Sequence, residues 1–133
     1  ADIPLEAAIA AACPDGVNIF FDNVGAETLD AALVNMAAGG RIVVSGQVAE
    51  YNRQNPVGIR EVTRFITHRL RMEGLVVYDY APKFTDAIGR MAALINAGKL
   101  AYTEDIIAGI ENAPDAYAGL FGGENLGRRL IRT

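Results

Sequence analysis

Three short apolar segments alternate with amphipathic segments over most of the chain, and this alternation constrains the fold more than any other feature. The apolar segments are 17–24, 41–45 and 71–78. They are rich in β-branched and aromatic residues, as expected for strands that are buried on both faces of a sheet. Because strands separated by helices join through right-handed crossovers, we expect a parallel sheet and an α/β fold.

Helices are expected around these strands, each with one apolar face. An alanine-rich helix should cover 5–12, a second should end at Gly39-Gly40, and a third should span 59–70. A fourth should have Pro82 in its first turn and end at Gly98. The residues expected to face inward are Leu29, Ala32, Leu33, Met36, Ile59, Val62, Phe65, Ile66, Phe84, Ile88, Met91 and Ile95.

The C-terminal segment has a different pattern. A strand is predicted at 102–107 and a closing strand at 128–132. Between them, Asn112 is placed to cap a short helix. The inward residues of that helix are expected to be Tyr117, Leu120 and Phe121.

A dinucleotide-binding sheet has two halves, and the first half carries the glycine-rich turn that binds the pyrophosphate. No Gly-x-Gly-x-x-Gly occurs between a strand and a helix here, since the glycine-rich stretch 119–127 follows a short helix and precedes the last strand. We therefore interpret 1–98 as the second half of a Rossmann-type parallel sheet with flanking helices, and 99–133 as part of another domain. The chain then looks like the C-terminal half of such a sheet followed by a tail.

Charge and composition argue against several functional classes. The formal net charge of −4 disfavours a general nucleic-acid-binding protein, which carries a basic surplus. No segment has the roughly 20 apolar residues that span a membrane, and no secretory signal is visible. Because Cys13 is the only cysteine, no internal disulfide can form. With His68 as the only histidine, a His/Cys zinc site is not expected. We expect a cytoplasmic protein with no metal, nucleic-acid or membrane partner.

Candidate ligand-binding residues fall at the carboxyl ends of the three predicted strands. Asn23 follows the first strand, Ser45 ends the second, and Val77 ends the third. Ligands of open α/β sheets bind at this edge. The sequence therefore predicts a ligand site there.

Four segments, taken together in this order and spacing, carry a resemblance that covers nearly the whole chain. The chain resembles the zinc-independent branch of the medium-chain dehydrogenase/reductase superfamily, and within it the group of prostaglandin, alkenal and curcumin reductases. The segments are Phe21-Asp22-Asn23-Val24-Gly25, Ser45-Gly46-Gln47 running to Tyr51-Asn52, Arg71-Met72-Glu73-Gly74-Leu75-Val76-Val77, and Gly123-Glu124-Asn125-Leu126-Gly127-Arg128.

The resemblance implies a fold and a reaction. The fold is a Rossmann domain inserted into a GroES-like β-barrel domain, to which the tail from about Lys99 returns. The reaction is hydride transfer from NADPH to the β-carbon of an α,β-unsaturated ketone or aldehyde, followed by protonation of the α-carbon. NADP(H) is therefore the expected cofactor, and a small enone, enal or quinone the expected substrate.

The resemblance also implies site residues near the nicotinamide half of the cofactor. Asn23 contacts the cofactor there with an amide that can donate and accept; the alternative is that it caps a turn. Ser45, Gly46 and Gln47 begin the loop along the nicotinamide ribose. Tyr51 in this loop is the expected catalytic residue, because its phenol stays protonated at neutral pH and can donate to the ribose or to the enolate.

Two further segments are implied to reach the cofactor. The backbone of Leu75, Val76 and Val77 meets the nicotinamide carboxamide, and Asn125 reaches back from the tail; the alternative for Asn125 is a turn residue. The sequence departs from the family pattern at Ala26, at Gln47-Val48-Ala49 and at Arg128, which stand in place of Gly, Ala-Ile-Ser and Lys.

Other functions stay open at this point. A quinone oxidoreductase of the same superfamily and a non-catalytic α/β interaction module fit the same pattern. A Rossmann methyltransferase is a weaker alternative, in which Asp22 would hold a ribose, because the tail motif has no role there.

Half of a parallel sheet leaves an unpaired apolar strand edge, which favours pairing with another chain. We therefore predict that a preparation of this chain alone is edge-paired, most simply as a homodimer. Sedimentation velocity measures this directly, and a clean monomer across the concentration range would contradict the prediction.

Overall fold

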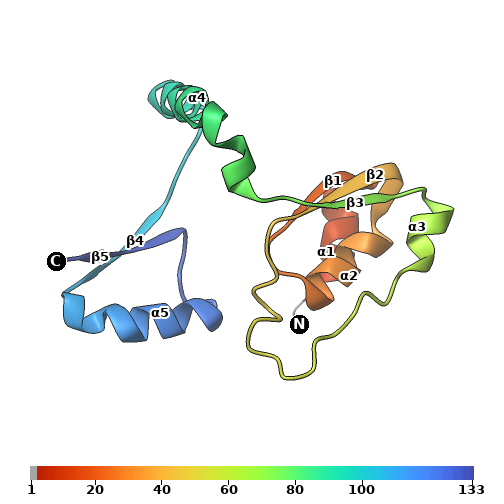
Figure 1. Ribbon diagram of the computed structural model, residues 1–133, viewed down its shortest axis with the longest axis horizontal. Helices are drawn as coiled ribbons and strands as arrows, with labels where there is room; N and C mark the ends of the chain where they lie inside the picture. Colours follow the sequence, from red (N-terminus) through yellow and green to blue (C-terminus); the bar gives the residue numbers. More distant parts are fainter. Residues whose placement is uncertain (1–2) are drawn as a thin grey trace. The chain divides into compact units, whose positions relative to one another are not determined.

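The computed structural model describes residues 3–133 as an α/β chain that divides into two compact units, Ala1–Ala81 and Pro82–Thr133 (Figure 1). The first unit contains, in chain order, α1 (Leu5–Ala12), β1 (Val17–Asp22), α2 (Ala26–Val34), β2 (Met36–Val44), α3 (Thr63–Thr67) and β3 (Arg71–Gly74). The 3-10 helix η1 (Val77–Lys83) runs across the division, and the second unit contains α4 (Phe84–Asn96), β4 (Glu104–Ala108), the 3-10 turn η2 (Ile110–Asn112), α5 (Ala113–Phe121) and β5 (Arg128–Arg132).

The first unit has the predicted parallel sheet, with strand order β1-β2-β3. The last residues of the three strands are in register, because Asp22 pairs with Val44 and Val44 pairs with Gly74. The three strands therefore end level. Whatever follows each strand leaves the sheet at the same edge.

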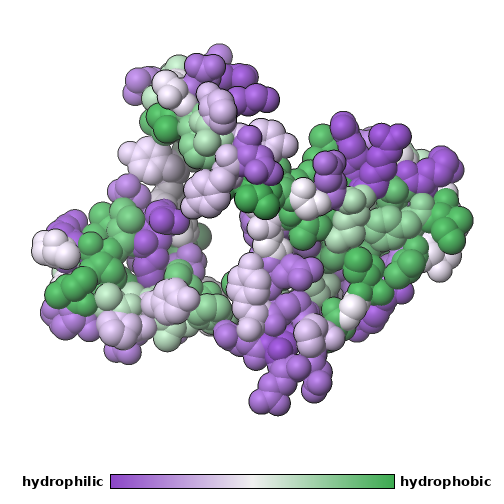
Figure 2. Space-filling view, in the orientation of Figure 1, coloured by the Kyte–Doolittle hydropathy of each residue, from purple (hydrophilic) through white to green (hydrophobic). Residues whose placement is uncertain are grey.

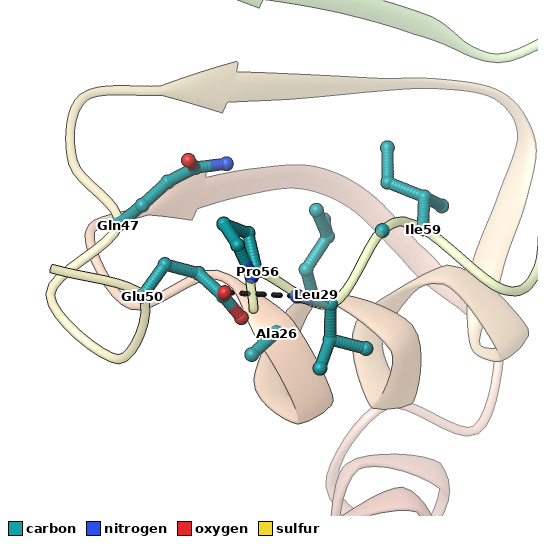
Figure 3. Close-up of a pocket in the computed structure, with 8 residues that line it drawn as sticks. Ala26, Leu29, Gln47, Glu50, Pro56 and Ile59 are labelled. Carbon is teal, nitrogen blue, oxygen red and sulfur yellow. Dashed lines mark hydrogen bonds between the residues drawn. The ribbon is translucent and has the colours of Figure 1, made fainter. Parts of the chain in front are cut away.

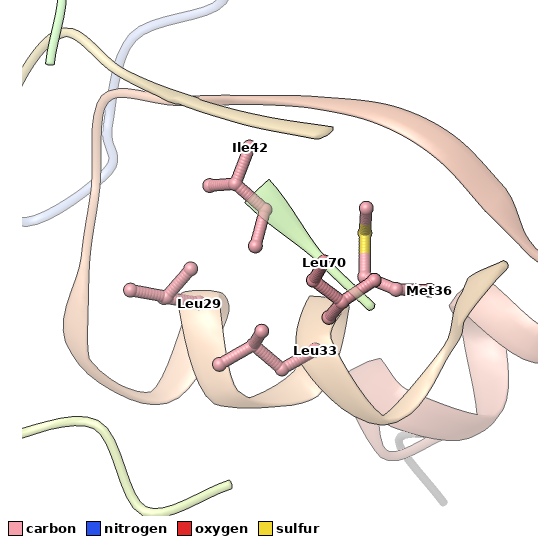
Figure 4. Close-up of a cluster of buried hydrophobic side chains, with 5 residues drawn as sticks. All are labelled: Leu29, Leu33, Met36, Ile42 and Leu70. Carbon is pink, nitrogen blue, oxygen red and sulfur yellow. The ribbon is translucent and has the colours of Figure 1, made fainter. Parts of the chain in front are cut away.

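The core of the first unit lies where α2 packs on one face of this sheet (Figure 4). Leu29 and Leu33 lie four residues apart on α2 and so share one side of the helix, as the sequence predicted. They contact Ile42 of β2, and all three are almost completely buried. Met36 and Leu70 complete the cluster.

The second helix ends earlier than the sequence predicted. α2 stops at Val34, and Met36 already belongs to β2, so Gly39-Gly40 lies inside a strand and does not cap a helix. The pairing of β1 with β2 is irregular between Val17 and Ile19. Gly39, with φ of +77°, allows this irregularity, and its amide donates to the carbonyl of His68. The side chain of Met36 still enters the core, so the apolar spacing was right although the element was wrong.

Three other helix predictions need correction. The third helix is only Thr63–Thr67, and Val62 and Ile66 are exposed, while Phe65 does pack against the core. Pro82 lies inside η1 and not in the first turn of α4. The predicted inward faces of α4 and α5 contain no buried large side chain; Ala116 and Gly119 are the buried residues of α5.

Several strand ends and one helix cap also differ from the positions predicted from the sequence. β1 ends at Asp22, β3 ends at Gly74, and the first strand of the second unit is Glu104–Ala108. Asn112 has a helical backbone conformation and makes no capping bond; its amide donates to the carbonyl of Ala108. Pairing with neighbouring strands decides where a strand ends, and that information is not local in sequence.

The second unit is held by a parallel pair, β4 and β5. The side chain of Arg129 is 10% exposed and donates to Asp105 across the pair and to the carbonyl of Ala116 on α5. Gly127, with φ of +79°, lies so close to the carbonyl of Thr103 that a Cβ atom would collide with it. The turn before β5 therefore requires glycine at this position.

Large apolar side chains reach the surface in both units (Figure 2). Ile19 and Phe21 on β1 are 62% and 53% exposed. None of the helices formed by residues 3–133 is long and apolar enough to cross a membrane. The edge-paired state remains a prediction.

Loss of a core methyl cluster should destabilise the first unit. Ile42→Ala removes a side chain that is 1% exposed, and we expect a loss of about 2–5 kcal/mol in the free energy of unfolding because the core cannot refill the cavity. Ile66→Ala is the matched control, since Ile66 is 78% exposed and should change stability by less than about 0.5 kcal/mol. Urea denaturation measures both, and equal losses for the two variants would show that the core lies elsewhere.

Candidate functional site

The candidate site is the edge at which β1, β2 and β3 end. Asn23, Ser45 and Leu75 follow the three strands directly. The amides of Ser45 and Gly46 both donate to the carbonyl of Asp22, at 2.8 and 3.2 Å, and the amide of Leu75 donates to the carbonyl of Val44 at 2.8 Å. The residues that leave the strands are therefore tied to one another, as the sequence predicted for this edge.

Asp22 organises this edge, and sequence reasoning considered it as a ligand-binding residue only for the methyltransferase alternative. It is completely buried at the end of β1. Its Oδ1 accepts hydrogen bonds from the amides of Val24 and Gly25, both at 2.9 Å, while its Oδ2 has no hydrogen-bond partner among the described residues. The available signal was a carboxylate directly after the apolar run Ile19-Phe20-Phe21, because a buried carboxylate needs donors close by.

Asn23, Gly46, Gln47 and Tyr51 come together beyond this turn, and we call these four residues the strand-end cluster. A Cβ atom added to Gly46 would lie 3.3 Å from the carbonyl oxygen of Asn23 and 3.4 Å from the hydroxyl of Tyr51. The amide of Gln47 donates to that hydroxyl at 3.3 Å. Four residues predicted for the site are thus neighbours in space.

The hydroxyl of Tyr51 keeps its proton available to a ligand. It accepts from the Gln47 amide, so its own O–H remains a donor, and the side chain is 68% exposed. The side chain of Asn23 is exposed and makes no hydrogen bond within residues 3–133. The side chain of Asp22 closes the turn after β1. The alternative prediction, that the side chain of Asn23 caps this turn, is therefore wrong.

The segment after β3 differs from its prediction in one respect. Val77 is not the last residue of the strand but the first residue of η1, because β3 ends at Gly74. Val76 and Val77 are both more than half exposed. The backbone from Leu75 onward still leaves the sheet beside the end of β2.

Asn125 belongs to the second unit. Its side-chain amide donates to the carbonyl of Gly127 at 2.9 Å and so closes its own turn. This is the contact expected of the turn-residue alternative. An approach of Asn125 to the strand-end cluster remains a prediction.

The loop that follows Gln47 lies against α2 and encloses a hollow of about 290 Å³. Ala26 and Leu29 line it from α2, and Gln47, Glu50 and Ile59 line it from the loop (Figure 3). One carboxylate oxygen of Glu50 accepts from the amide of Val57 at 3.0 Å, which closes the loop on itself.

Two ion pairs fasten the loop to α2. Arg53 contacts both oxygens of Glu27 at 3.1 and 3.0 Å, and also Glu50 at 3.2 Å. The backbone amide and the guanidinium of Arg60 donate to Asp30 at 3.0 and 2.6 Å. The loop is therefore fixed near its middle and at its end.

These contacts shift the pKa values of their carboxyl groups. Burial opposes ionisation of Asp30 most strongly, but the hydrogen bonds from Arg60 outweigh it and hold the pKa of Asp30 below its ordinary value. A backbone hydrogen bond and then one from Arg53 lower the pKa of Glu27. A carboxyl group with a lowered pKa stabilises the fold at pH values above its ordinary pKa, and this contribution is lost as the pH falls through the lowered pKa. Both ion pairs are therefore intact at neutral pH and weaken only in acid.

No metal site is formed by this part of the chain. Among residues 3–133, no group of three or more His, Cys, Asp or Glu side chains is placed to hold a metal ion. Cys13 is a free cysteine at the end of α1. The chemistry that these residues offer at the strand ends is hydrogen bonding, from a phenol, an amide and backbone groups.

A family model described as zinc-binding dehydrogenase matches residues 3–131. The 2-alkenal reductase (NADP(+)-dependent) of Nicotiana tabacum is 42% identical over 127 residues, which cover 96% of this chain and 37% of the relative. Prostaglandin reductase 1 of Bos taurus is 35% identical over 131 residues, which cover 97% of this chain and 40% of the relative.

A solved structure has the same arrangement of elements. CurA from Vibrio vulnificus, in complex with NADPH, matches with a TM-score of 0.84 at 30% identity, covering 96% of this chain and 40% of that chain. The chain thus spans about two fifths of the length of the relatives that it matches.

Removing the Asp22 carboxylate should loosen the turn that carries Asn23. Asp22→Ala leaves the buried amides of Val24 and Gly25 without an acceptor, and we expect a loss of about 2–4 kcal/mol in the free energy of unfolding. Asp22→Asn keeps an oxygen in the accepting position and should cost less. Thermal and urea denaturation compare them, and an Asn variant as unstable as the Ala variant would contradict the role of Oδ1.

Proposed function

The chain belongs to the zinc-binding dehydrogenase family, and from this premise we propose that it acts in an NADP-dependent reductase of activated carbon–carbon double bonds. The substrates of this proposal are α,β-unsaturated ketones or aldehydes. The observation that carries it is the strand-end cluster, in which the hydroxyl of Tyr51 lies beside Gly46 and close to the backbone of Asn23, and has a proton left to donate. The named activities of the tobacco and bovine relatives support the same reaction class.

NADP(H) fits the residues at this edge. Ser45 is exposed and Gly46 is half-buried, so polar groups that follow β2 are accessible to a ligand. The polar side chains of Asn23 and Tyr51 are exposed there. The carboxyl edge of an open parallel sheet is where dinucleotides bind, and the NADPH complex of the Vibrio vulnificus relative supports this assignment.

The protein's own residues would orient the cofactor and supply a proton donor. When bound, NADPH supplies the hydride that the β-carbon of the substrate accepts. Asn23 offers an amide to the nicotinamide half, and the backbone of Leu75, Val76 and Val77 offers donors and acceptors to the carboxamide. Tyr51 would donate a hydrogen bond to the ribose hydroxyl or to the substrate oxygen on which negative charge develops. The enolate would then take a proton at its α-carbon, from Tyr51 or from water.

The other parts of the proposal concern the whole protein. Residues 1–98 would complete a Rossmann domain and 99–133 would belong to the GroES-like domain, with Asn125 reaching the cofactor when the two are assembled. The proposed reaction is zinc-independent, as the resemblance to the zinc-independent branch implies. A reducing cytoplasm suits a protein with a single free thiol.

Substitution of Tyr51 tests the proposal. In the full-length natural protein, Tyr51→Phe should lower kcat for reduction of an enone by roughly a hundredfold, because the developing oxyanion loses its donor. The KM for NADPH should change less. NADPH oxidation with enone, enal and quinone substrates measures both.

Tyr102→Phe is the matched control, since Tyr102 is 66% exposed in the second unit. It should retain the full rate. The proposal fails if the unmodified protein turns over none of the three substrate classes with NADPH. The catalytic role of Tyr51 is overturned if Tyr51→Phe is as fast as Tyr102→Phe.

A further inference from the structure

The segment between Val44 and Thr63 contains no helix or strand, yet side-chain hydrogen bonds and ion pairs tie it to itself and to α2. Irregular segments of this length are uncommon inside compact domains unless they serve a function. Tyr51 lies within it. The contacts that hold the segment therefore decide where the phenol is.

Arg53 makes the central contact of this segment. Its guanidinium reaches both oxygens of Glu27, on the first turn of α2, and one oxygen of Glu50. Glu27 is well placed as an anchor, because the start of a helix stabilises a negative charge. We call Glu27, Glu50 and Arg53 the Arg53 clamp.

Glu50 makes the clamp more than a surface ion pair. An exposed ion pair contributes about 0–1 kcal/mol to stability, which is too little to fix the position of a loop. The Glu50 side chain, however, is only 9% exposed, and its second oxygen accepts from the amide of Val57. Without Arg53, a nearly buried carboxylate would lose its counter-charge, which is costly.

Tyr51 lies in sequence between two members of the clamp, Glu50 and Arg53. The amide of Glu50 donates to the carbonyl of Gln47 at 2.8 Å, and the amide of Arg53 donates to the carbonyl of Glu50 at 3.1 Å. The hydroxyl of Tyr51 accepts a hydrogen bond from the amide of Gln47. A movement of Glu50 and Arg53 away from α2 would carry the phenol away from Gly46 and Asn23.

We propose that Arg53 is a positioning residue, which holds Tyr51 in the strand-end cluster by clamping its loop to Glu27 and Glu50. The proposal rests on the proposed function for its catalytic consequence. Its structural consequence, the protection of the loop, stands independently of any reaction.

The experiment compares Arg53→Met, Glu27→Gln and the double variant in the full-length natural protein. Hydrogen exchange of the amides in 47–57 reports the clamp, and steady-state kinetics with NADPH and an enone report its effect. We expect Arg53→Met to speed exchange of this segment and to lower kcat about tenfold, because misplacement of a reacting group by less than 1 Å is costly. The KM for NADPH should stay within about twofold, since the nicotinamide contacts of Asn23 remain.

Three comparisons separate positioning from general damage. Arg53→Lys keeps the charge and should recover part of kcat and of the loop protection. The double variant should be no worse than Arg53→Met, because the two residues act through one contact. Arg90→Met is the matched control, since Arg90 on α4 makes no ion pair within the described residues.

Opposite outcomes overturn different statements. Unchanged exchange in 47–57 for Arg53→Met overturns the clamp. Faster exchange with unchanged kcat shows that the clamp exists but does not position Tyr51, and so overturns the proposal. Faster exchange in a protein that reduces no enone in any form supports the clamp and overturns the proposed function.

Discussion

The buried carboxylate of Asp22 is the interaction on which the strand-end cluster depends. Its side chain fixes the turn that begins with Asn23, and its carbonyl receives the amides of Ser45 and Gly46. One residue at the end of β1 thus joins two of the three loops that leave the sheet. A buried carboxylate is costly unless donors surround it, so this geometry tolerates little variation.

Ion pairs between residues distant in sequence hold the loop that carries Tyr51. Arg53 and Arg60 bind carboxylates of α2, and α2 is itself anchored by Leu29 and Leu33 in the core. The position of an exposed phenol is therefore linked to the packing of a buried helix. An irregular loop can hold a reactive group only when such contacts replace the backbone hydrogen bonds of regular structure.

Similarity to reductases covers almost all of this chain but about two fifths of each relative. Ile19 and Phe21 of β1 and several large apolar residues of α4 are exposed, and the turn that carries Asn125 belongs to a unit with a two-stranded sheet. Exposed apolar surfaces of this kind are those on which further protein packs.

The sequence by itself determined the α/β class, the parallel orientation of three strands, the core side chains of α2 and the sheet edge at which Asn23 and Ser45 lie. Apolar periodicity and strand order carry this information, because both depend on spacing along the chain. Only the tertiary structure decided that Met36 starts a strand, that α3 is one short turn, that Asp22 closes the edge and that Arg53 holds the loop of Tyr51. These features depend on partners distant in sequence, such as the pairs of Arg53 with Glu27 and of Arg60 with Asp30, which no local pattern encodes.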